Sequence, residues 1–151
     1  MIGYVYDADG QRLAKGTITT FSCDVTANGF TATSDYVRDQ AGNQLSEFTV
    51  SGGSVTLVHT NVWANGALIA TDDQTETHYY LNDWLGTRRV QVNYAGNLEQ
   101  TCASLPYGDA ETCGAPPSGN QYTGKEKDAE TAGGVSPFGV NQGNDYFGAR
   151  Y

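Results

Sequence analysis

Residues 89–98, with the sequence Arg89-Val-Gln-Val-Asn-Tyr-Ala-Gly-Asn-Leu98, decide the fold class of this chain. The apolar residues Val90, Val92 and Tyr94 alternate with polar ones, and a period of two places the two sets on opposite faces of a β-strand. We expect solvent to cover the polar face. Its residues are Arg89, Gln91 and Asn93. The following Gly96 favours a turn, so the segment predicts a strand that ends in a β-hairpin.

Glycines followed closely by a leucine recur along the chain and predict hairpin tips. The four elements are Gly10–Leu13, Gly42–Leu45, Gly66–Leu68 and Gly96–Leu98. Asp9-Gly10 and Asn65-Gly66 suit two-residue turns, because both central positions of such a turn need a positive φ. The Ala-Gly pairs at the other two tips favour a longer turn with a left-handed glycine. Asn28-Gly29 could form one more tip.

The composition also indicates a β-sheet protein. The 151 residues include 19 glycines and 10 tyrosines, and only 38% of them are hydrophobic. Glycine suits turns, whereas tyrosine and β-branched residues suit a pleated surface. We therefore predict an all-β fold, with antiparallel β-hairpin repeats in a curved or spirally wound sheet. It forms one unit over 1–151, with hairpin repeats in 1–77 and a loop-rich block in 78–151; only 125–132 could form a short helical turn.

Charge and hydropathy exclude several kinds of partner. The formal net charge of −9 disfavours nucleic acid, whose binding depends on clustered Lys and Arg. No apolar run approaches the roughly 20 residues that span a bilayer, and residues 1–20 lack the pattern of a signal peptide. The opening Met1-Ile-Gly-Tyr-Val-Tyr-Asp7 is typical of the middle of a repeat, so we expect a segment of a longer gene product or a truncated reading frame.

Blocks of sequence near both ends resemble the Rhs, or YD-repeat, family at its repeat-associated core. The first two blocks are Tyr6-Asp-Ala-Asp-Gly10 and His78-Tyr-Tyr-Leu-Asn-Asp-Trp-Leu-Gly-Thr-Arg-Arg-Val90. The last has two parts, Tyr122-Thr-Gly-Lys-Glu-Lys-Asp-Ala-Glu-Thr131 and Asn144-Asp-Tyr-Phe-Gly-Ala-Arg-Tyr151. Trp84 stands where the family's pattern usually has a histidine, and residues 132–144 look like an insertion.

The resemblance implies a container and not a catalyst. Members of that family wind β-strand repeats into a hollow shell around a C-terminal effector, usually a toxin. We expect a non-catalytic shell segment, without cofactor or metal, whose partners are the rest of a larger Rhs polypeptide and its enclosed effector. The parent protein would be bacterial and secreted or at the cell surface. The family's self-cleavage aspartates follow the position of Tyr151, so that activity is not carried over; an adhesion or carbohydrate- or protein-binding β module is the alternative.

The resemblance also assigns an architectural role to a set of signature positions. They are Tyr79, Tyr80, Asp83, Leu85, Gly86, Tyr122, Gly124, Lys125, Glu126, Asp128, Tyr146, Gly148 and Arg150. Opposite charges alternate over residues 125–128, which suggests a local charge network that fixes a tight turn. Exposed strand edges of such a segment invite pairing, so the isolated chain is expected to dimerise through a β edge or to be marginally stable.

The three cysteines and two histidines provide few candidates for chemistry. Cys102 and Cys113 could close a loop as a disulfide or stay reduced, and Cys23 is left over. A zinc site is disfavoured because the cysteines lack the paired spacing that such sites use. We interpret His59 and His78 as strand residues hydrogen-bonded at a surface.

The acidic residues and the tyrosines each allow two interpretations. The acidic residues Asp72, Asp73, Asp128 and Glu130 could serve as an acid and base or bind calcium, but turn positions explain Asp72 and Asp73 more simply. The ten tyrosines favour packing between repeats over an exposed carbohydrate-binding strip, because a tyrosine ring can be buried while its hydroxyl group reaches water.

Overall fold

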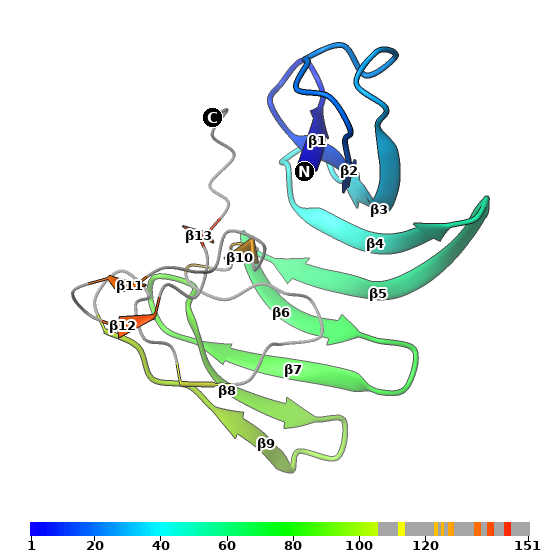
Figure 1. Cartoon of the computed structure of the whole chain (residues 1–151). Coiled ribbons are helices and arrows are strands. Elements are labelled where there is room, and N and C mark those ends of the chain that lie inside the picture. Colours follow the sequence, from blue (N-terminus) through cyan, green and yellow to red (C-terminus); the bar gives the residue numbers. More distant parts are fainter. Residues whose placement is uncertain are drawn as a thin grey trace. The chain divides into compact units, whose positions relative to one another are not determined.

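A computed structural model describes residues 1–105, 112–113, 123, 125 and 127–128, and three short strands beyond them. The fold is all-β, as predicted: nine strands form one antiparallel sheet in which each strand lies beside the next one in sequence (Figure 1). No α-helix occurs in the part of the chain that the structure describes. The strands are β1 Ile2–Tyr6, β2 Arg12–Thr17, β3 Thr31–Arg38, β4 Gln44–Ser51, β5 Ser54–Ala64, β6 Ala67–Asp72, β7 Thr77–Asn82, β8 Arg88–Asn93 and β9 Leu98–Thr101.

The chain divides into two compact units within strand β5. Residues 1–60 belong to the first unit and residues 61–147 to the second. The first unit therefore contains β1 to β4, and the second contains β6 to β9. None of the described segments forms a helix long and apolar enough to cross a membrane.

One turn geometry closes four of the hairpins. At Asp83, the side-chain Oδ1 accepts the backbone N–H of Leu85 at 2.9 Å and of Thr87 at 3.0 Å. The N–H of Gly86 donates to the carbonyl oxygen of Asp83 at 2.9 Å. Asp7, Asp39 and Asn93 make the corresponding bonds in their own turns. The glycine three residues after each of them has a φ of 79° to 83°, a left-handed conformation that costs glycine little.

The predicted hairpin tips are confirmed at four glycines, although one turn type was wrong. Asn65 and Gly66 have φ values of 51° and 76°, as a two-residue turn requires. Asp9-Gly10 does not form such a turn, because the carboxylate of Asp7 accepts two backbone N–H groups and holds a longer one. Asn28-Gly29 lies in the connection between β2 and β3, and Gly86 is a tip that the glycine-leucine pattern missed.

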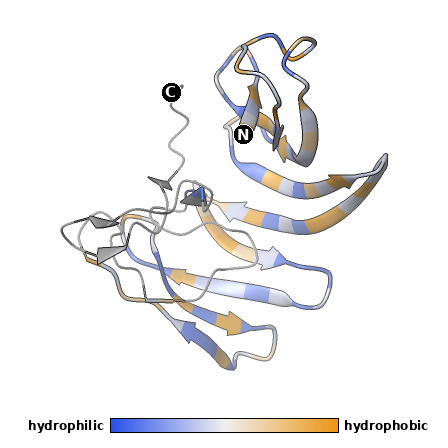
Figure 2. Ribbon diagram, in the orientation of Figure 1, coloured by the Kyte–Doolittle hydropathy of each residue, from blue (hydrophilic) through white to orange (hydrophobic). Residues whose placement is uncertain are grey.

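The polar face of β8 is the buried one, contrary to the sequence-based expectation. Gln91 is only 3% exposed, and its cross-strand neighbour Tyr80 is 7% exposed. On the opposite face, Val90 and Val92 pair with Leu81 and Tyr79, which are 60% and 46% exposed. Hydrophilic and hydrophobic residues both occur along the strands of the sheet (Figure 2). The reversal is tolerated because the buried polar side chains have hydrogen-bond partners, which offset their loss of water.

Buried polar residues occur throughout both units and outnumber the buried apolar ones among the described residues. They are Arg12, Asn28, Gln44, His59, Asn61, Thr71, His78, Thr87, Arg88, Gln91 and Asp128. Hydrogen bonding, in addition to the hydrophobic effect, therefore determines how the strands pack.

Three tyrosines lie under arginine side chains at equivalent positions, three residues before the turn aspartate. The pairs are Arg12 with Tyr4 at 4.3 Å, Arg38 with Tyr36 at 5.7 Å, and Arg88 with Tyr80 at 5.9 Å, measured from guanidinium carbon to ring centroid. Tyr36 and Tyr80 are buried, as the packing interpretation predicts, whereas Tyr79 and Tyr94 are exposed.

Short strands join the two parts of the last sequence block. β10 (Lys127–Asp128) pairs with β13 (Asn144–Asp145), and β11 (Val135–Ser136) pairs with β12 (Gly139–Val140). The short helical turn expected at 125–132 is therefore wrong at residues 127–128, because these residues take their hydrogen bonds from a strand partner far along the chain.

We expect Asp83→Ala to lower the free energy of unfolding by about 1–3 kcal/mol, because two backbone N–H groups lose a charged acceptor. Asp83→Asn is the matched control. Asn93 makes the same turn bonds with an amide, so this variant should lose only the partly buried ion pair with Arg89, worth about 1 kcal/mol. Urea unfolding measures both values, and equal losses in the two variants would contradict the turn assignment.

Candidate functional site

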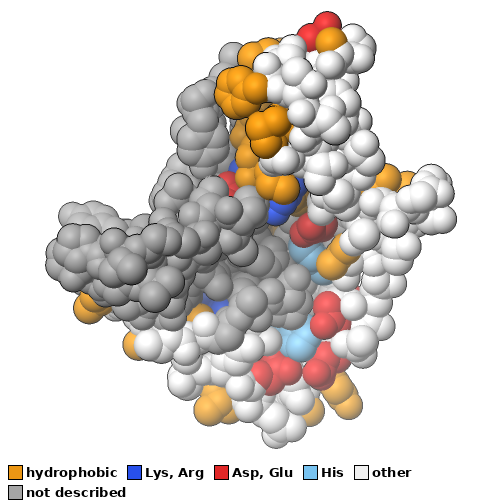
Figure 3. All heavy atoms as spheres, in the orientation of Figure 1, with side chains coloured by type: hydrophobic (Ala, Val, Ile, Leu, Met, Phe, Trp, Pro, Cys, Tyr) orange, Lys and Arg blue, Asp and Glu red, His pale blue; other side chains and the backbone are white. Residues whose placement is uncertain are grey.

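A cluster of titratable side chains surrounds His78 in the second unit. Strand β7 carries His78 on its buried face, the turn between β6 and β7 supplies Asp73 and Glu76, and β9 supplies Glu99. In the space-filling view each histidine lies beside acidic side chains (Figure 3). This is the densest group of ionisable residues that the structure describes in the second unit.

Both ring nitrogens of His78 face carboxylates. Nδ1 lies 2.8 Å from Glu99 Oε2, and Nε2 lies 3.3 Å from Asp73 Oδ2. The His78 side chain is 8% exposed, whereas those of Asp73 and Glu99 are 28% and 21% exposed. The imidazole is therefore buried between two carboxylates that remain in contact with solvent.

Hydrogen bonds hold the carboxylates of Glu99 and Asp73 in position. Arg88 Nη1 donates to Gln91 Oε1 at 2.7 Å, and Gln91 Nε2 donates to Glu99 Oε2 at 3.0 Å. On the other side, Asp73 Oδ1 accepts the backbone N–H groups of Thr75 at 3.0 Å and Glu76 at 3.1 Å. The positions of Asp73 and Glu99 are thus set by the turn and by β8.

The electrostatics of the cluster favour a charged imidazole and charged carboxylates. Burial by itself would lower the pKa of His78, but the hydrogen bonds and charges of Glu99 and Asp73 outweigh it and raise that pKa above the ordinary value. The hydroxyl of Thr75, the backbone N–H groups of the turn and His78 hold the pKa of Asp73 well below its ordinary value. Burial opposes the same effect at Glu99, but His78 and Gln91 still lower its pKa.

Three side chains of this cluster could hold a metal ion. One ligand atom from each of Glu76, His78 and Glu99 lies within 4.8 Å of the other two. Imidazole nitrogen and carboxylate oxygen are common ligands of divalent metals. The cluster can thus bind either a proton or a cation between its carboxylates.

The second histidine has a simpler environment. His59 is fully buried, its Nε2 is 3.3 Å from Gln44 Nε2, and its Nδ1 is 3.9 Å from Glu47 Oε2. Burial raises the pKa of Glu47 despite the charges of Lys15 and Arg12. The expectation that both histidines lie at a surface was wrong, because the polar face on which they lie is the covered one.

Thr123, in the last sequence block, contacts the block His78–Val90. The backbone N–H of Thr123 donates to the hydroxyl of Thr87 at 3.2 Å, in the turn that Asp83 closes. A Cβ atom at Gly86 would lie 3.7 Å from the backbone of Thr123. The architectural interpretation of these positions remains a prediction, although two of the blocks do meet here.

The remaining signature positions differ in what the structure says of them. Asp128 is buried and Leu85 is 47% exposed. Trp84, which departs from the family's pattern, is 91% exposed. Lys125 is described, but its neighbour in the proposed charge network, Glu126, lies outside the described residues. Outside the described residues lie Tyr122, Gly124, Glu126, Tyr146, Gly148 and Arg150, as do Tyr107, Glu130 and Tyr151.

Cys102 and Cys113 are joined in a disulfide, which resolves the alternative that the sequence left open. Arg88 Nη2 lies 3.2 Å from the sulfur of Cys113, so the bridge contacts the hydrogen-bonded interior of the second unit. Cys23 is free and exposed.

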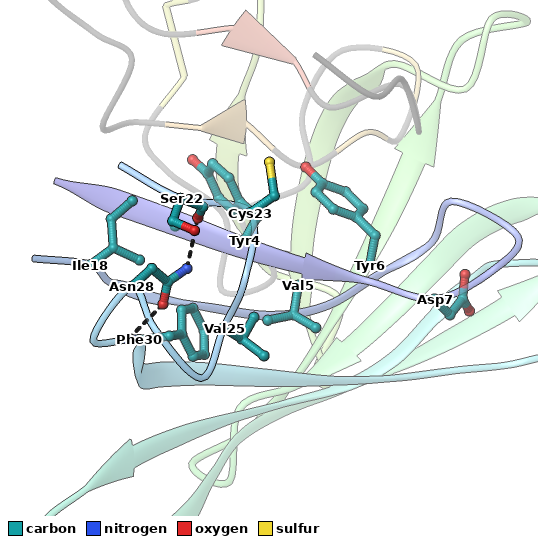
Figure 4. A pocket seen from close by; sticks show the side chains of 11 residues that line it. Tyr4, Val5, Tyr6, Asp7, Ile18, Ser22, Cys23, Val25, Asn28 and Phe30 are labelled. Atoms are coloured by element: carbon teal, nitrogen blue, oxygen red, sulfur yellow. Dashed lines mark hydrogen bonds between the residues drawn. The ribbon is translucent and has the colours of Figure 1, made fainter. Parts of the chain in front are cut away.

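A pocket of about 580 Å³ lies in the first unit, between β1 and the connection from β2 to β3 (Figure 4). Tyr4, Tyr6 and Phe30 supply aromatic rings to its lining, and Cys23 contributes a thiol. Asn28 stabilises the connection between β2 and β3, because its Nδ2 donates to the carbonyl oxygen of Ser22 at 3.0 Å. The lining is mainly apolar and aromatic.

Little in the sequence indicated the His78 cluster. Glu76 and His78 are two residues apart, a spacing that places side chains on one face of a strand, and this was the available signal. Glu99 and Gln91 come from other strands, so only the register of β7, β8 and β9 brings them to the histidine.

Comparisons with known proteins place this chain in no family. No protein-family model matches it, and a comparison with curated proteins gives no match.

We expect His78→Gln to lower stability by about 1–3 kcal/mol at pH 6 and by less at pH 9. A raised folded-state pKa contributes stability that is fully present below the unfolded value of about 6.5 and is lost as the pH rises through the folded value. Urea unfolding in the presence of a chelator measures this difference. Asp9→Asn, at an exposed turn residue, is the control, and a destabilisation that is the same at both pH values would contradict the ion pairing.

Reduction of the disulfide should lower the free energy of unfolding by about 3 kcal/mol, because a loop of this length is released in the unfolded chain. Cys113→Ala should reproduce the effect, whereas Cys23→Ser should not. Thermal unfolding with and without reductant checks this, and identical melting temperatures would contradict a bridge that supports the fold.

Proposed function

We propose that this chain is a non-catalytic structural segment of an Rhs-type β-shell, which encloses a C-terminal effector and helps to deliver it. One observation carries the proposal: the unit Tyr-x-x-Asp-x-x-Gly occurs at residues 4–10, 36–42 and 80–86. Each copy has the same turn hydrogen bonds and an arginine over its tyrosine. A wall built from such units can be extended by adding copies, as in other repeat proteins.

The sheet topology supports this proposal. Every strand from β1 to β9 lies beside its sequence neighbour, so the sheet needs no crossover and more hairpins can be added at either edge. The contact of Thr123 with Thr87 also supports it, because it brings together two blocks that the resemblance identifies as core sequence.

The partners in this proposal are the rest of a larger Rhs polypeptide and the effector inside the shell. The bacterial parent protein would act outside the cell or at its surface. The Cys102–Cys113 disulfide supports an oxidising location, where such bonds persist. The residues around His78 would then stabilise the wall and would not catalyse a reaction.

The test uses the complete gene product that contains this sequence. Limited proteolysis should leave the polypeptide that follows residue 151 intact, because a closed wall keeps the protease out. Asp39→Ala combined with Asp83→Ala opens two of the repeated turns, and we expect it to make that polypeptide cleavable. Asp39→Asn combined with Asp83→Asn is the matched control and should retain protection.

Two results would overturn the proposal. The first is a reading frame without further Tyr-x-x-Asp-x-x-Gly units on either side. The second is digestion of the following polypeptide at the same rate in the parent protein and in the turn variant. Electron microscopy of the same samples shows directly whether a hollow particle forms.

A specific observation favours a second candidate, a β module that binds another protein or a carbohydrate. Tyr79, Leu81 and Leu98 are 46%, 60% and 64% exposed, and the cross-strand pairing of β7, β8 and β9 places them on one face. Exposed apolar faces often mark binding surfaces. Loss of binding in Tyr79→Ser combined with Leu81→Ser, with proteolytic protection retained, would favour this candidate.

A further inference from the structure

The cluster around His78 carries more negative charge than its single imidazole can neutralise. Asp73, Glu76 and Glu99 each contribute a carboxylate, and even a protonated His78 leaves two net negative charges. Neighbouring carboxylates repel each other unless they share a proton or a cation. Glu76 and Glu99 are such a pair, with ligand atoms within 4.8 Å of each other.

We propose that Glu76, His78 and Glu99 form a binding site for a divalent transition-metal cation, with Zn²⁺ as the ion that best fits the ligand set. His78 would bind through Nδ1, the nitrogen that faces Glu99, and each glutamate would supply a carboxylate oxygen. Zinc accepts imidazole and carboxylate ligands together, whereas Ca²⁺ and Mg²⁺ prefer oxygen alone.

Asp73 would not bind the metal itself. It would accept the N–H of the His78 ring nitrogen that the metal leaves free. A histidine that binds a metal through one ring nitrogen usually donates the other N–H to a carboxylate, which fixes the tautomer and the orientation of the ring. His78 Nε2 already lies 3.3 Å from Asp73 Oδ2. Asp73 is itself held by the backbone N–H groups of Thr75 and Glu76, so the imidazole is aligned before a metal arrives.

Glu99 is supported in the same way. Gln91 Nε2 donates to Glu99 Oε2 at 3.0 Å, and Arg88 Nη1 donates to Oε1 of the same amide at 2.7 Å. Two of the three ligands, His78 and Glu99, are therefore held in position by Asp73 and Gln91. The Glu99 side chain is 21% exposed, which gives a metal access from solvent.

Without metal, a proton on His78 takes the place of the cation. Nδ1–H then donates to Glu99 across 2.8 Å. Metal binding releases that proton to solvent and forms the Nδ1–metal bond, while the Nε2–H bond to Asp73 remains. Proton and metal therefore compete for one atom, and metal affinity should increase with pH. This site is independent of the proposed shell function.

The experiment titrates Zn²⁺ into the full chain after removal of metals with a chelator. The background is Cys23→Ser, which removes the exposed thiol as a competing ligand. Isothermal titration calorimetry should give one ion per chain. His78→Gln and Glu99→Gln should each weaken binding by at least tenfold. Glu47→Gln is the matched control, because Glu47 also lies beside a histidine but without the second carboxylate, and it should bind as the parent does.

A measurement on the parent chain keeps the test decisive if a variant fails to fold. The chain has two histidines, so the imidazole resonances of His59 and His78 can be distinguished by NMR. Mn²⁺, a paramagnetic ion, should broaden those of His78 and spare those of His59. Equal broadening of both, unchanged Zn²⁺ affinity in His78→Gln, or no binding of Zn²⁺ to the parent chain would each overturn the proposal.

Discussion

The hydrogen bonds between an aspartate or asparagine side chain and two backbone N–H groups are the interaction on which the rest of the sheet depends. They close the turns at Asp7, Asp39, Asp83 and Asn93. Each turn is followed by a register shift in the ladder. After the first three turns, the strand residue that lies between the turn and the shift is buried. The side chains placed there are Arg12, Gln44 and Arg88, all of them almost fully buried.

A polar interior follows from this placement of long polar side chains. Arginine lies over tyrosine, and glutamine joins arginine to a carboxylate. Burial of such groups is costly unless each is hydrogen-bonded, and a satisfied network fixes one arrangement of strands. The opposite face retains Tyr79 and Leu81 in contact with solvent. In the proposed wall, that apolar face is free to contact other parts of the assembly.

Long-range links stabilise the end of the second unit, where the strands are short. The Cys102–Cys113 disulfide and the bond from Thr123 to Thr87 attach later segments to β8 and to its turn. The pairing of β10 with β13 brings together two blocks separated by an apparent insertion. The disulfide and the Thr123 bond thus link the described residues Cys113 and Thr123 to the end of the nine-stranded sheet.

The sequence by itself determined the all-β class and the main hairpin tips, because turn glycines and alternating strands act over a few residues. It did not determine which face is covered: periodicity separates the faces of β8, but only packing decides which of them meets water, and Gln91 lies inside. Asp73, Glu76 and His78 are close in sequence, but the sequence did not show that Glu99 joins them, because Glu99 lies on β9, beyond β8 in the sheet. The tertiary structure decided the site, since the register of neighbouring strands is what brings those side chains within bonding distance.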